Sequence, residues 1–296
     1  FELVKENGLE SADVTINEKS SFAVSVFHKE IDSLTSSSTY SLVARGIKDH
    51  KLGTAVVDSQ NKVTPEYLIE TIKRSASLIE NNDPVSIFKG SEKYHKKSLS
   101  NSYIFEQKTE EIVRILLEIE EKLKKFDKRI NEVVSVGYSR SYSHYKKSNS
   151  YGLKLSQKTS TYSYYAEVTA KDKDEVRSGY DVFVSIDPTE FDINKFVEKV
   201  AKDALSKLGS IQAKSKKYPV VLNPEAASTL IGCLLNSLNA EEVQKHTSLL
   251  ENKLNQKVLS SKLTLIENPL EKNAFFRYFD DEGVATSKKY LINKGV

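Results

Sequence analysis

Residues 218–258 read YPVVLNPEAASTLIGCLLNSLNAEEVQKHTSLLENKLNQKV and join a short apolar run to a long apolar helix. The run from Tyr218 to Leu222 is typical of a buried strand. Asn223 offers a side chain that can cap a helix, and Pro224 suits the first helical position, where its missing N–H costs nothing. Apolar residues then recur at three- and four-residue spacing, which predicts one broad buried helix face. They are Ala226, Ala227, Leu230, Ile231, Leu234, Leu235 and Leu238.

The predicted helix carries no side chain that is typical of catalysis. Cys233 is the one cysteine of the chain, and its place among leucines predicts a small buried hydrophobe rather than a nucleophile or a disulfide partner. The histidines show no pair at the helical spacing of metal ligands. These histidines are His28, His50, His95, His144 and His246.

Polar motifs that end in or contain glycine occur in other parts of the chain. They are Asn149-Ser150-Tyr151-Gly152, Ser178-Gly179-Tyr180, and Asp280-Asp281-Glu282-Gly283 with Val284 and Thr286. In the last of them, a turn in which Asp caps the backbone and Gly takes a positive φ fits the sequence. A catalytic acid pair requires two carboxylates opposed across a cleft, and adjacency in sequence does not supply that geometry.

The order and spacing of these segments resemble the TldD/PmbA family, and in particular its PmbA branch, also called TldE. The resemblance rests on the N-S-x-G, S-G-Y and F-D-D-E-G-V-x-T motifs, on residues 218–258, and on the N-terminal run at residues 20–59. It covers essentially the whole chain. It implies an α+β fold and a further β-rich C-terminal portion that this sequence does not include. The family-motif residues, expected to be structural or interface residues, are Asn149, Ser150, Gly152, Ser178, Gly179, Asp280, Asp281 and Gly283.

The resemblance also implies where catalysis resides. In the TldD branch, the equivalent helix carries His-Glu-x-x-x-His, in which two histidines hold zinc and the glutamate serves the bound water. The nearest register in this chain places Ile231, Gly232 and Asn236 at those positions. None of these side chains replaces a zinc-bound imidazole or a general base. The resemblance thus implies no catalytic residue, no metal ligand and no cofactor here, with zinc in a TldD-like partner.

The function implied is that of a non-catalytic subunit of a TldD/TldE-type zinc peptidase that acts on unfolded or small peptides. One alternative is a stand-alone peptidase of the same family, and another is a regulatory binding protein linked to DNA gyrase, the sense in which the family was historically called a modulator of DNA gyrase. The expected partners are a TldD-like zinc subunit and a peptide. A homodimer in isolation is a further expectation.

Composition excludes several other classes of function. The 44 basic and 41 acidic residues nearly balance, so no nucleic-acid-binding field is indicated. No apolar run approaches the roughly 18 residues of a membrane span. A single cysteine suits a reducing compartment, so we expect a cytoplasmic protein without membrane or direct nucleic-acid contact.

The remaining sequence predicts two sheet-plus-helix units, residues 1–130 and residues 131–296. Residues 11–57 alternate as an antiparallel sheet, and Thr64-Pro65-Glu66 opens a helix. The spacing of apolar residues from about Lys108 to Phe126 predicts a second, long helix with one buried face. Residues 131–186 read as a strand meander rich in tyrosine, for which ordinary cross-strand pairing is favoured over a peptide-binding surface. Asp187-Pro188-Thr189-Glu190 resembles a capping box that opens another helix. A strand begins at Tyr290.

Overall fold

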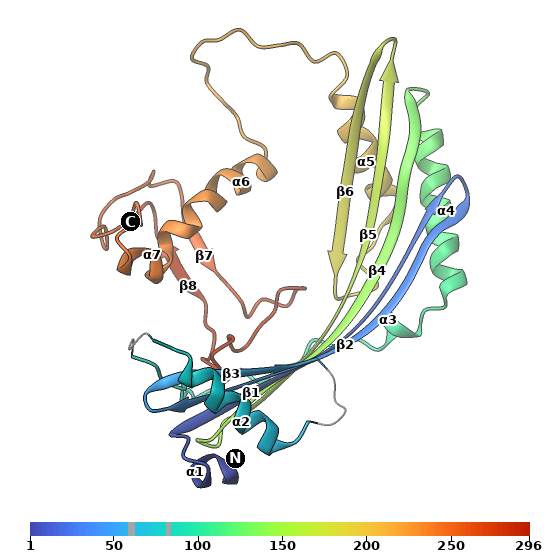
Figure 1. Ribbon diagram of the computed structural model, residues 1–296. Coiled ribbons are helices and arrows are strands. Elements are labelled where there is room, and N and C mark those ends of the chain that lie inside the picture. The colour runs from blue at the N-terminus through green and yellow to red at the C-terminus, as the bar shows by residue number, and fades with distance from the viewer. Residues whose placement is uncertain (59–62, 81–83) are drawn as a thin grey trace. The chain divides into compact units, whose positions relative to one another are not determined.

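The computed structural model describes residues 1–58, 63–80 and 84–296, which divide into two compact units (Figure 1). Unit 1 comprises Phe1–Ser210 and Glu271–Thr286, and unit 2 comprises Ile211–Leu270 and Ser287–Val296. The elements of unit 1 are α1 (Glu2–Glu6), β1 (Ser11–Phe27), β2 (Glu30–Lys48), β3 (Lys51–Val57), α2 (Pro65–Ser77), α3 (Tyr103–Glu106), α4 (Thr109–Phe126), β4 (Ile130–Asn149), β5 (Lys154–Asp172), β6 (Glu175–Ser185) and α5 (Ile193–Ser206). Those of unit 2 are α6 (Pro224–Leu235), the 3₁₀ helix Asn236–Leu238, α7 (Ala240–Gln244), β7 (Leu265–Glu267) and β8 (Lys289–Ile292).

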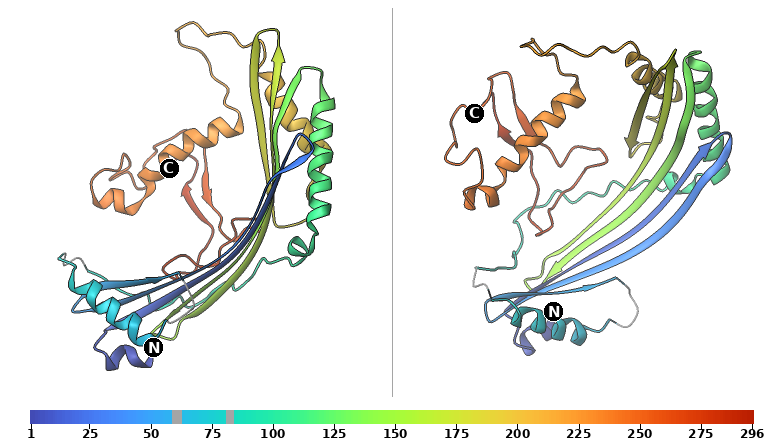
Figure 2. Two further views of the ribbon diagram at one scale, coloured as in Figure 1. Left: turned by 45° about the vertical axis from the view of Figure 1, so that its right-hand side comes forward. Right: turned by 45° about the horizontal axis from the view of Figure 1, so that its top comes forward.

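Unit 1 is built on one curved six-stranded sheet with the strand order β3-β2-β1-β4-β5-β6. The course of its long strands is visible in both views of Figure 2. All neighbouring strands are antiparallel. The predicted α+β class is confirmed. Strands β1–β3 of the first predicted sheet-plus-helix unit and β4–β6 of the second belong to this single sheet, whereas β7 and β8 form a separate pair. The boundary predicted at residue 130 coincides with the start of β4. Whether that boundary separates two folding domains stays a prediction.

Two apolar cores cover the same face of the sheet at its two ends. At one end, Ile69 and Ile72 of α2 pack on small residues of β1, β2 and β3, such as Ala44 and Ala55. At the other end, α4 and α5 pack on β1, β4, β5 and β6. The α4 residues Ile112, Leu116, Ile119 and Leu123 are completely buried there, as their spacing predicts.

The opposite face of the sheet carries short hydroxyl side chains. Ser21 of β1 lies opposite Ser37 of β2 and Ser141 of β4, and Ser141 lies opposite Thr161 of β5. Hydroxyl oxygens bridge neighbouring strands at 2.8 Å between Ser21 and Ser37 and at 2.9 Å between Ser141 and Thr161. Alternation along each strand thus separates an apolar, helix-covered face from a hydroxyl face.

Side-chain caps mark the starts of α2 and α5 in unit 1. The Thr64 hydroxyl accepts a hydrogen bond from the Tyr67 backbone N–H at 3.2 Å, and Pro65 begins α2, as predicted. The predicted capping box at residues 187–190 is wrong as the start of α5. Asp192 caps that helix instead, accepting from the N–H groups of residues 194 and 195, while Asp187 closes a separate turn by accepting from Thr189.

The core contains several of the tyrosines from the predicted meander. Tyr138, Tyr162 and Tyr164 are buried and pack together, with ring centroids 5.1 to 6.3 Å apart. Burial raises the pKa of Tyr138 and of Tyr162 to about 12. The strand meander is confirmed, and for these three residues the favoured interpretation, aromatic packing between strands, holds.

Unit 2 corrects two expectations about residues 218–258. The helix α6 does begin at Pro224, and the Asn223 side chain accepts from the Ala226 N–H at 2.8 Å. However, no residue of α6 is buried, Cys233 is exposed, and the expected buried strand from Tyr218 to Leu222 does not form. A buried strand requires a neighbouring strand and a covering layer, and the only strand pair among the described residues of unit 2 is β7 with β8.

The predicted strand at Tyr290 is confirmed as β8. Within the described ranges, no helix is both long and apolar enough to cross a membrane.

Gly179 of β6 generates a test of the packing between β6 and α5. A Cβ at this position would lie 2.3 Å from the Ala204 backbone nitrogen, so Gly179→Ala must push α5 away from the sheet. We expect the free energy of unfolding of the protein, measured by urea titration with far-UV circular dichroism, to fall by about 3 kcal/mol.

Gly137→Ala provides the matched control for that experiment. Gly137 lies in β4 of the same sheet, and the nearest atom to its added Cβ is 3.7 Å away, an ordinary contact. This variant is expected to match or exceed the wild-type stability by about 0.5–1 kcal/mol, because alanine loses less backbone entropy. Equal losses in the two variants would contradict the close approach of α5.

Candidate functional site

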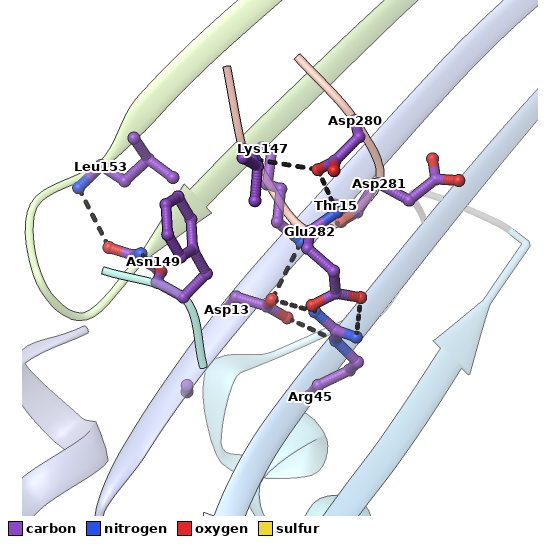
Figure 3. Close-up of polar contacts among 12 residues, drawn as sticks. Asp13, Thr15, Arg45, Lys147, Asn149, Leu153, Asp280, Asp281 and Glu282 are labelled. Carbon is purple, nitrogen blue, oxygen red and sulfur yellow. Dashed lines mark hydrogen bonds and ion pairs between the residues drawn. The ribbon is translucent and has the colours of Figure 1, made fainter. Parts of the chain in front are cut away.

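The acidic motif at Asp280–Gly283 forms a tight turn on the hydroxyl face of the sheet in unit 1 (Figure 3). The Asp280 carboxylate accepts hydrogen bonds from the backbone N–H groups of Glu282, at 2.9 Å, and of Val284, at 2.8 Å. Gly283 has a φ of +90°, which side chains other than glycine rarely adopt. Asp280 therefore shapes the turn, as the sequence predicts for this motif.

The other two carboxylates of the turn reach side chains on the sheet. Glu282 forms a two-pronged ion pair with Arg45 of β2, with N–O distances of 2.7 and 2.8 Å. Asp281 pairs with Arg277 and accepts a hydrogen bond from the Tyr145 hydroxyl at 3.2 Å. The Arg45 and Arg277 guanidinium groups hold the pKa of Glu282 and of Asp281 below their usual ranges.

Beneath the turn lies a buried group of charges that the sequence analysis did not identify. Asp13 of β1 and Lys147 of β4 are each 1% exposed, and Lys147 Nζ lies 2.9 Å from Asp13 Oδ2. Arg45 donates to both oxygens of the same carboxylate, at 3.0 and 2.5 Å. Lys147 also donates to the Thr15 hydroxyl at 3.3 Å. We call Asp13, Arg45, Lys147 and Glu282 the charge cluster.

Strand register brings the charge cluster together. Asp13 lies directly opposite Arg45 on β2 and Asn149 on β4, and Thr15 lies opposite Lys147. Burial alone raises the pKa of Asp13, but hydrogen bonds and charge from Arg45 and Lys147 outweigh burial and hold its pKa below the usual value. The Asp13 carboxylate is thus ionised at neutral pH and is not a proton donor.

The N-S-x-G motif ends β4 beside the same cluster. The Asn149 side-chain oxygen accepts from the N–H groups of Tyr151 and Leu153, at 2.9 and 3.0 Å, and its amide nitrogen donates to the Phe88 carbonyl at 2.6 Å. The Ser150 hydroxyl accepts from the Ala12 N–H at 3.1 Å. Gly152, with a φ of +92°, completes the turn. The structure therefore brings two sequence motifs together around Asp13.

The third motif lies elsewhere in unit 1. Ser178 and Gly179 are on β6, where Gly179 allows the close approach of α5 and the Ser178 carbonyl accepts from Lys207 Nζ at 2.9 Å. The roles expected for the family-motif residues stay predictions, and their contacts are those just described.

The positions that the resemblance aligns with the zinc motif of the TldD branch lie in unit 2. Ile231 is half-buried and Gly232 is exposed, both on α6, and the exposed Asn236 follows at the helix end. An added Cβ on Gly232 would have no atom within 4 Å. In the part of the chain that the structure describes, no three His, Cys, Asp or Glu side chains form a group that could hold a metal ion.

Sequence reasoning missed Asp13, Arg45 and Lys147 because charged residues in alternating strands ordinarily face solvent. A signal was present: Lys147 lies two residues before Asn149, the first residue of the N-S-x-G motif, and Asp13 interrupts an otherwise uncharged strand start. The charge cluster is an ion-pair network that joins β1, β2 and β4 to the acidic turn, because each of its carboxylates is paired with a cation.

Removing Lys147 from the charge cluster should destabilise the folded protein. Lys147→Met leaves the buried Asp13 with one cation fewer, and we expect the free energy of unfolding to fall by about 3 kcal/mol in urea titrations. Adding Asp13→Asn to Lys147→Met should cost less than the sum of the two single changes, because the unpaired charge is then gone. Strict additivity would show that Asp13 and Lys147 do not interact.

Acid should weaken the ion pairs of the charge cluster. Because the folded-state pKa of Asp13 lies below its unfolded value, its stabilising contribution is present above about pH 4 and is lost as the pH falls through the folded-state value. The stability difference between the wild type and Asp13→Asn should therefore be constant from pH 5 to 7 and shrink below pH 4. A difference that grows below pH 4 would contradict the lowered pKa.

Three family models match successive parts of this chain. They are described as PmbA/TldA metallopeptidase domain 1, at residues 12–79, the central domain, at residues 102–208, and the C-terminal domain, at residues 215–296.

Curated relatives bear the same name. Metalloprotease PmbA of Escherichia coli O157:H7 is 21% identical over 293 residues, which cover 97% of this chain and 64% of the relative. A metalloprotease PmbA homolog of Buchnera aphidicola is 28% identical over 150 residues, covering 50% of this chain and 34% of the homolog. The chain thus spans less than two thirds of the length of either relative.

Solved structures share the fold over the whole chain. A proposed modulator of a DNA gyrase from Thermotoga maritima has a TM-score of 0.90 at 24% identity and covers 100% of this chain and 67% of its own. TldE from Thermococcus kodakarensis has a TM-score of 0.86 at 25% identity, covering 99% and 67%. With all three family models matched in order between residues 12 and 296, the chain belongs to the PmbA/TldE family.

Proposed function

We propose that this chain is a non-catalytic subunit that works with a TldD-like zinc peptidase on unfolded or small peptides. One observation carries the proposal: the family scaffold is present, but Ile231, Gly232 and Asn236 occupy the positions at which a zinc helix needs two imidazoles and a carboxylate. Isoleucine and glycine have no donor atom for zinc, and an asparagine amide is a poor substitute for an imidazole.

The charge cluster supports the same assignment. Its carboxylates, Asp13 and Glu282, are both paired with cations, so neither is available as a general base for a water molecule. The acidic turn that resembles a catalytic group by composition instead fixes the 271–286 segment to the sheet. In this proposal, hydrolysis takes place in the partner, and the chain contributes surface to the peptide-handling complex in the cytoplasm.

Exposed apolar side chains on α6, in unit 2, also support the proposal of a partner subunit. Leu230 is 59% exposed and Leu235 is 48% exposed, so the described residues of unit 2 leave these two leucines of the apolar helix uncovered. Apolar helices of this kind are ordinarily covered by further chain or by a partner.

The test is reconstitution of peptide cleavage. The full-length protein and its TldD-like relative are mixed, and hydrolysis of a fluorogenic unfolded decapeptide is followed with each protein alone and with both. We expect a stable complex, cleavage only when the relative is present, and at least a tenfold faster rate for the mixture than for the relative alone.

The matched control replaces the zinc-motif glutamate of the relative by glutamine, which should abolish cleavage without preventing complex formation. Cleavage by this protein alone, together with one tightly bound zinc per chain, would establish the stand-alone peptidase instead. Absence of both a complex and a rate change would refute the subunit role.

A further inference from the structure

The two edges of the six-stranded sheet differ in how they are protected. Strand β6 and the part of β5 before Tyr162 form one margin, and β3 and the free part of β2 form the other (Figure 2). Exposed sheet edges present rows of unpaired N–H and C=O groups, and proteins usually shield them with charges, proline or covering segments. An open edge in the same sheet is therefore a place where a further strand can pair.

The β6 edge is shielded by α5. The Tyr180 backbone N–H donates to the Asp203 carboxylate at 3.2 Å, and the Ser178 carbonyl accepts from Lys207 Nζ at 2.9 Å. Asp203 and Lys207 form an ion pair with each other at 2.8 Å. Two outward backbone groups in the middle of β6 are thus already bonded, and an added strand would have to displace them.

The β2 edge is open between Ser33 and Ser41. Strand β3 pairs with β2 only from Leu42 onward, and residues 30–39 are exposed along their whole length. Residues 33–41 contain no charge and no proline, and their pairing with β1 has no bulge. Among the described residues, no side chain hydrogen-bonds to the outer backbone groups of this nine-residue stretch.

Register identifies the backbone groups that face outward. The Ile47 carbonyl accepts from the Glu10 N–H on the β1 side of β2. Because successive residues of a strand direct their N–H and C=O groups to opposite edges, odd-numbered residues of β2 face β1. The even-numbered residues Leu34, Ser36, Ser38 and Tyr40 therefore direct their N–H and C=O groups away from the sheet.

We propose that the β2 edge from Ser33 to Ser41 binds an extended, unfolded peptide by strand addition. The inference rests on the proposed peptide-handling function and specifies how the peptide is held. Main-chain hydrogen bonds supply the affinity in this mode of recognition. Every residue of the stretch except Leu34 carries a hydroxyl group, which both donates and accepts, so the edge tolerates many side chains on the bound peptide.

The same composition argues against a stable subunit at this edge. Permanent interfaces bury well over about 1,200 Å² and have an apolar centre. Ser33–Ser41 offers one aliphatic side chain, Leu34, which is 51% exposed. Such an edge suits a peptide that binds and leaves. The strand itself stays in register through hydroxyl pairs to β1, such as Ser25 with Ser33 at 2.8 Å.

The experiment measures binding of a peptide to the full-length protein without its relative. The probe is a fluorescein-labelled nonapeptide of alternating threonine and glutamine, followed by fluorescence anisotropy. Ser36→Pro removes one outward N–H from the open edge, where proline is tolerated, and should weaken binding about five- to tenfold. The same nonapeptide N-methylated at its five central residues should not bind.

Val182→Pro is the matched control, because it removes an outward N–H from the opposite edge strand, β6, and should change binding less than twofold. Thermal melts establish that both variants are folded. Absence of binding to the wild type, equal binding by Ser36→Pro, equal loss in Val182→Pro, or binding of the N-methylated probe would each overturn the proposal.

Sedimentation of the wild type and Ser36→Pro adds one further outcome. If the substitution dissociates a dimer while leaving peptide binding intact, the edge is an interface between copies and the proposal fails. Because no zinc relative is present in these measurements, their result is independent of the cleavage assay. Peptide binding by this protein, with neither a complex nor stimulated cleavage in the mixture, would retain the β2 site and refute the subunit role. A complex with stimulated cleavage, but no peptide binding at the β2 edge, would retain the subunit role and refute the β2 site.

Discussion

The arrangement of unit 1 depends on neutralising one buried carboxylate. Asp13 is buried on β1, which lies between β2 and β4. Without partners, a buried charge in that position would lower the stability of the folded state by several kcal/mol. Lys147 and Arg45 supply the compensation from β4 and β2, so the register on both sides of β1 is fixed by the same group. Arg45 then extends the pairing to Glu282, which ties a segment distant in sequence to the sheet.

Local chemistry allowed much of the fold to be predicted from sequence. Thr64 and Pro65 mark the start of α2, and Asn223 and Pro224 mark that of α6, because caps act over three or four residues. The burial of α4 follows from its spacing. The capping-box prediction at Asp187 failed for a related reason: Asp192 has a competing capping side chain closer to the apolar run, and sequence alone does not rank two nearby caps.

Prediction failed wherever the outcome depends on a distant partner. The apolar residues of α6 and of Tyr218–Leu222 predict burial, but the sequence does not say which segment covers them. The described residues of unit 2 do not bury them. The charge cluster was missed for the same reason. Asp13 and Lys147 are adjacent only because β1 and β4 pair in antiparallel register across more than a hundred residues of sequence.

The family motifs and the catalytic motif respond to different constraints. Gly152 and Gly283 hold backbone conformations with positive φ, and Gly179 permits α5 to approach β6, so substitution at any of them strains the scaffold. Nothing comparable constrains Gly232, which has open space around its Cα. Zinc ligands can therefore be absent from α6 without strain to the scaffold, whereas the turns around Asp13 cannot change freely. This asymmetry gives a physical reason why the family scaffold is retained around Asp13 while the residues of α6 are free to vary.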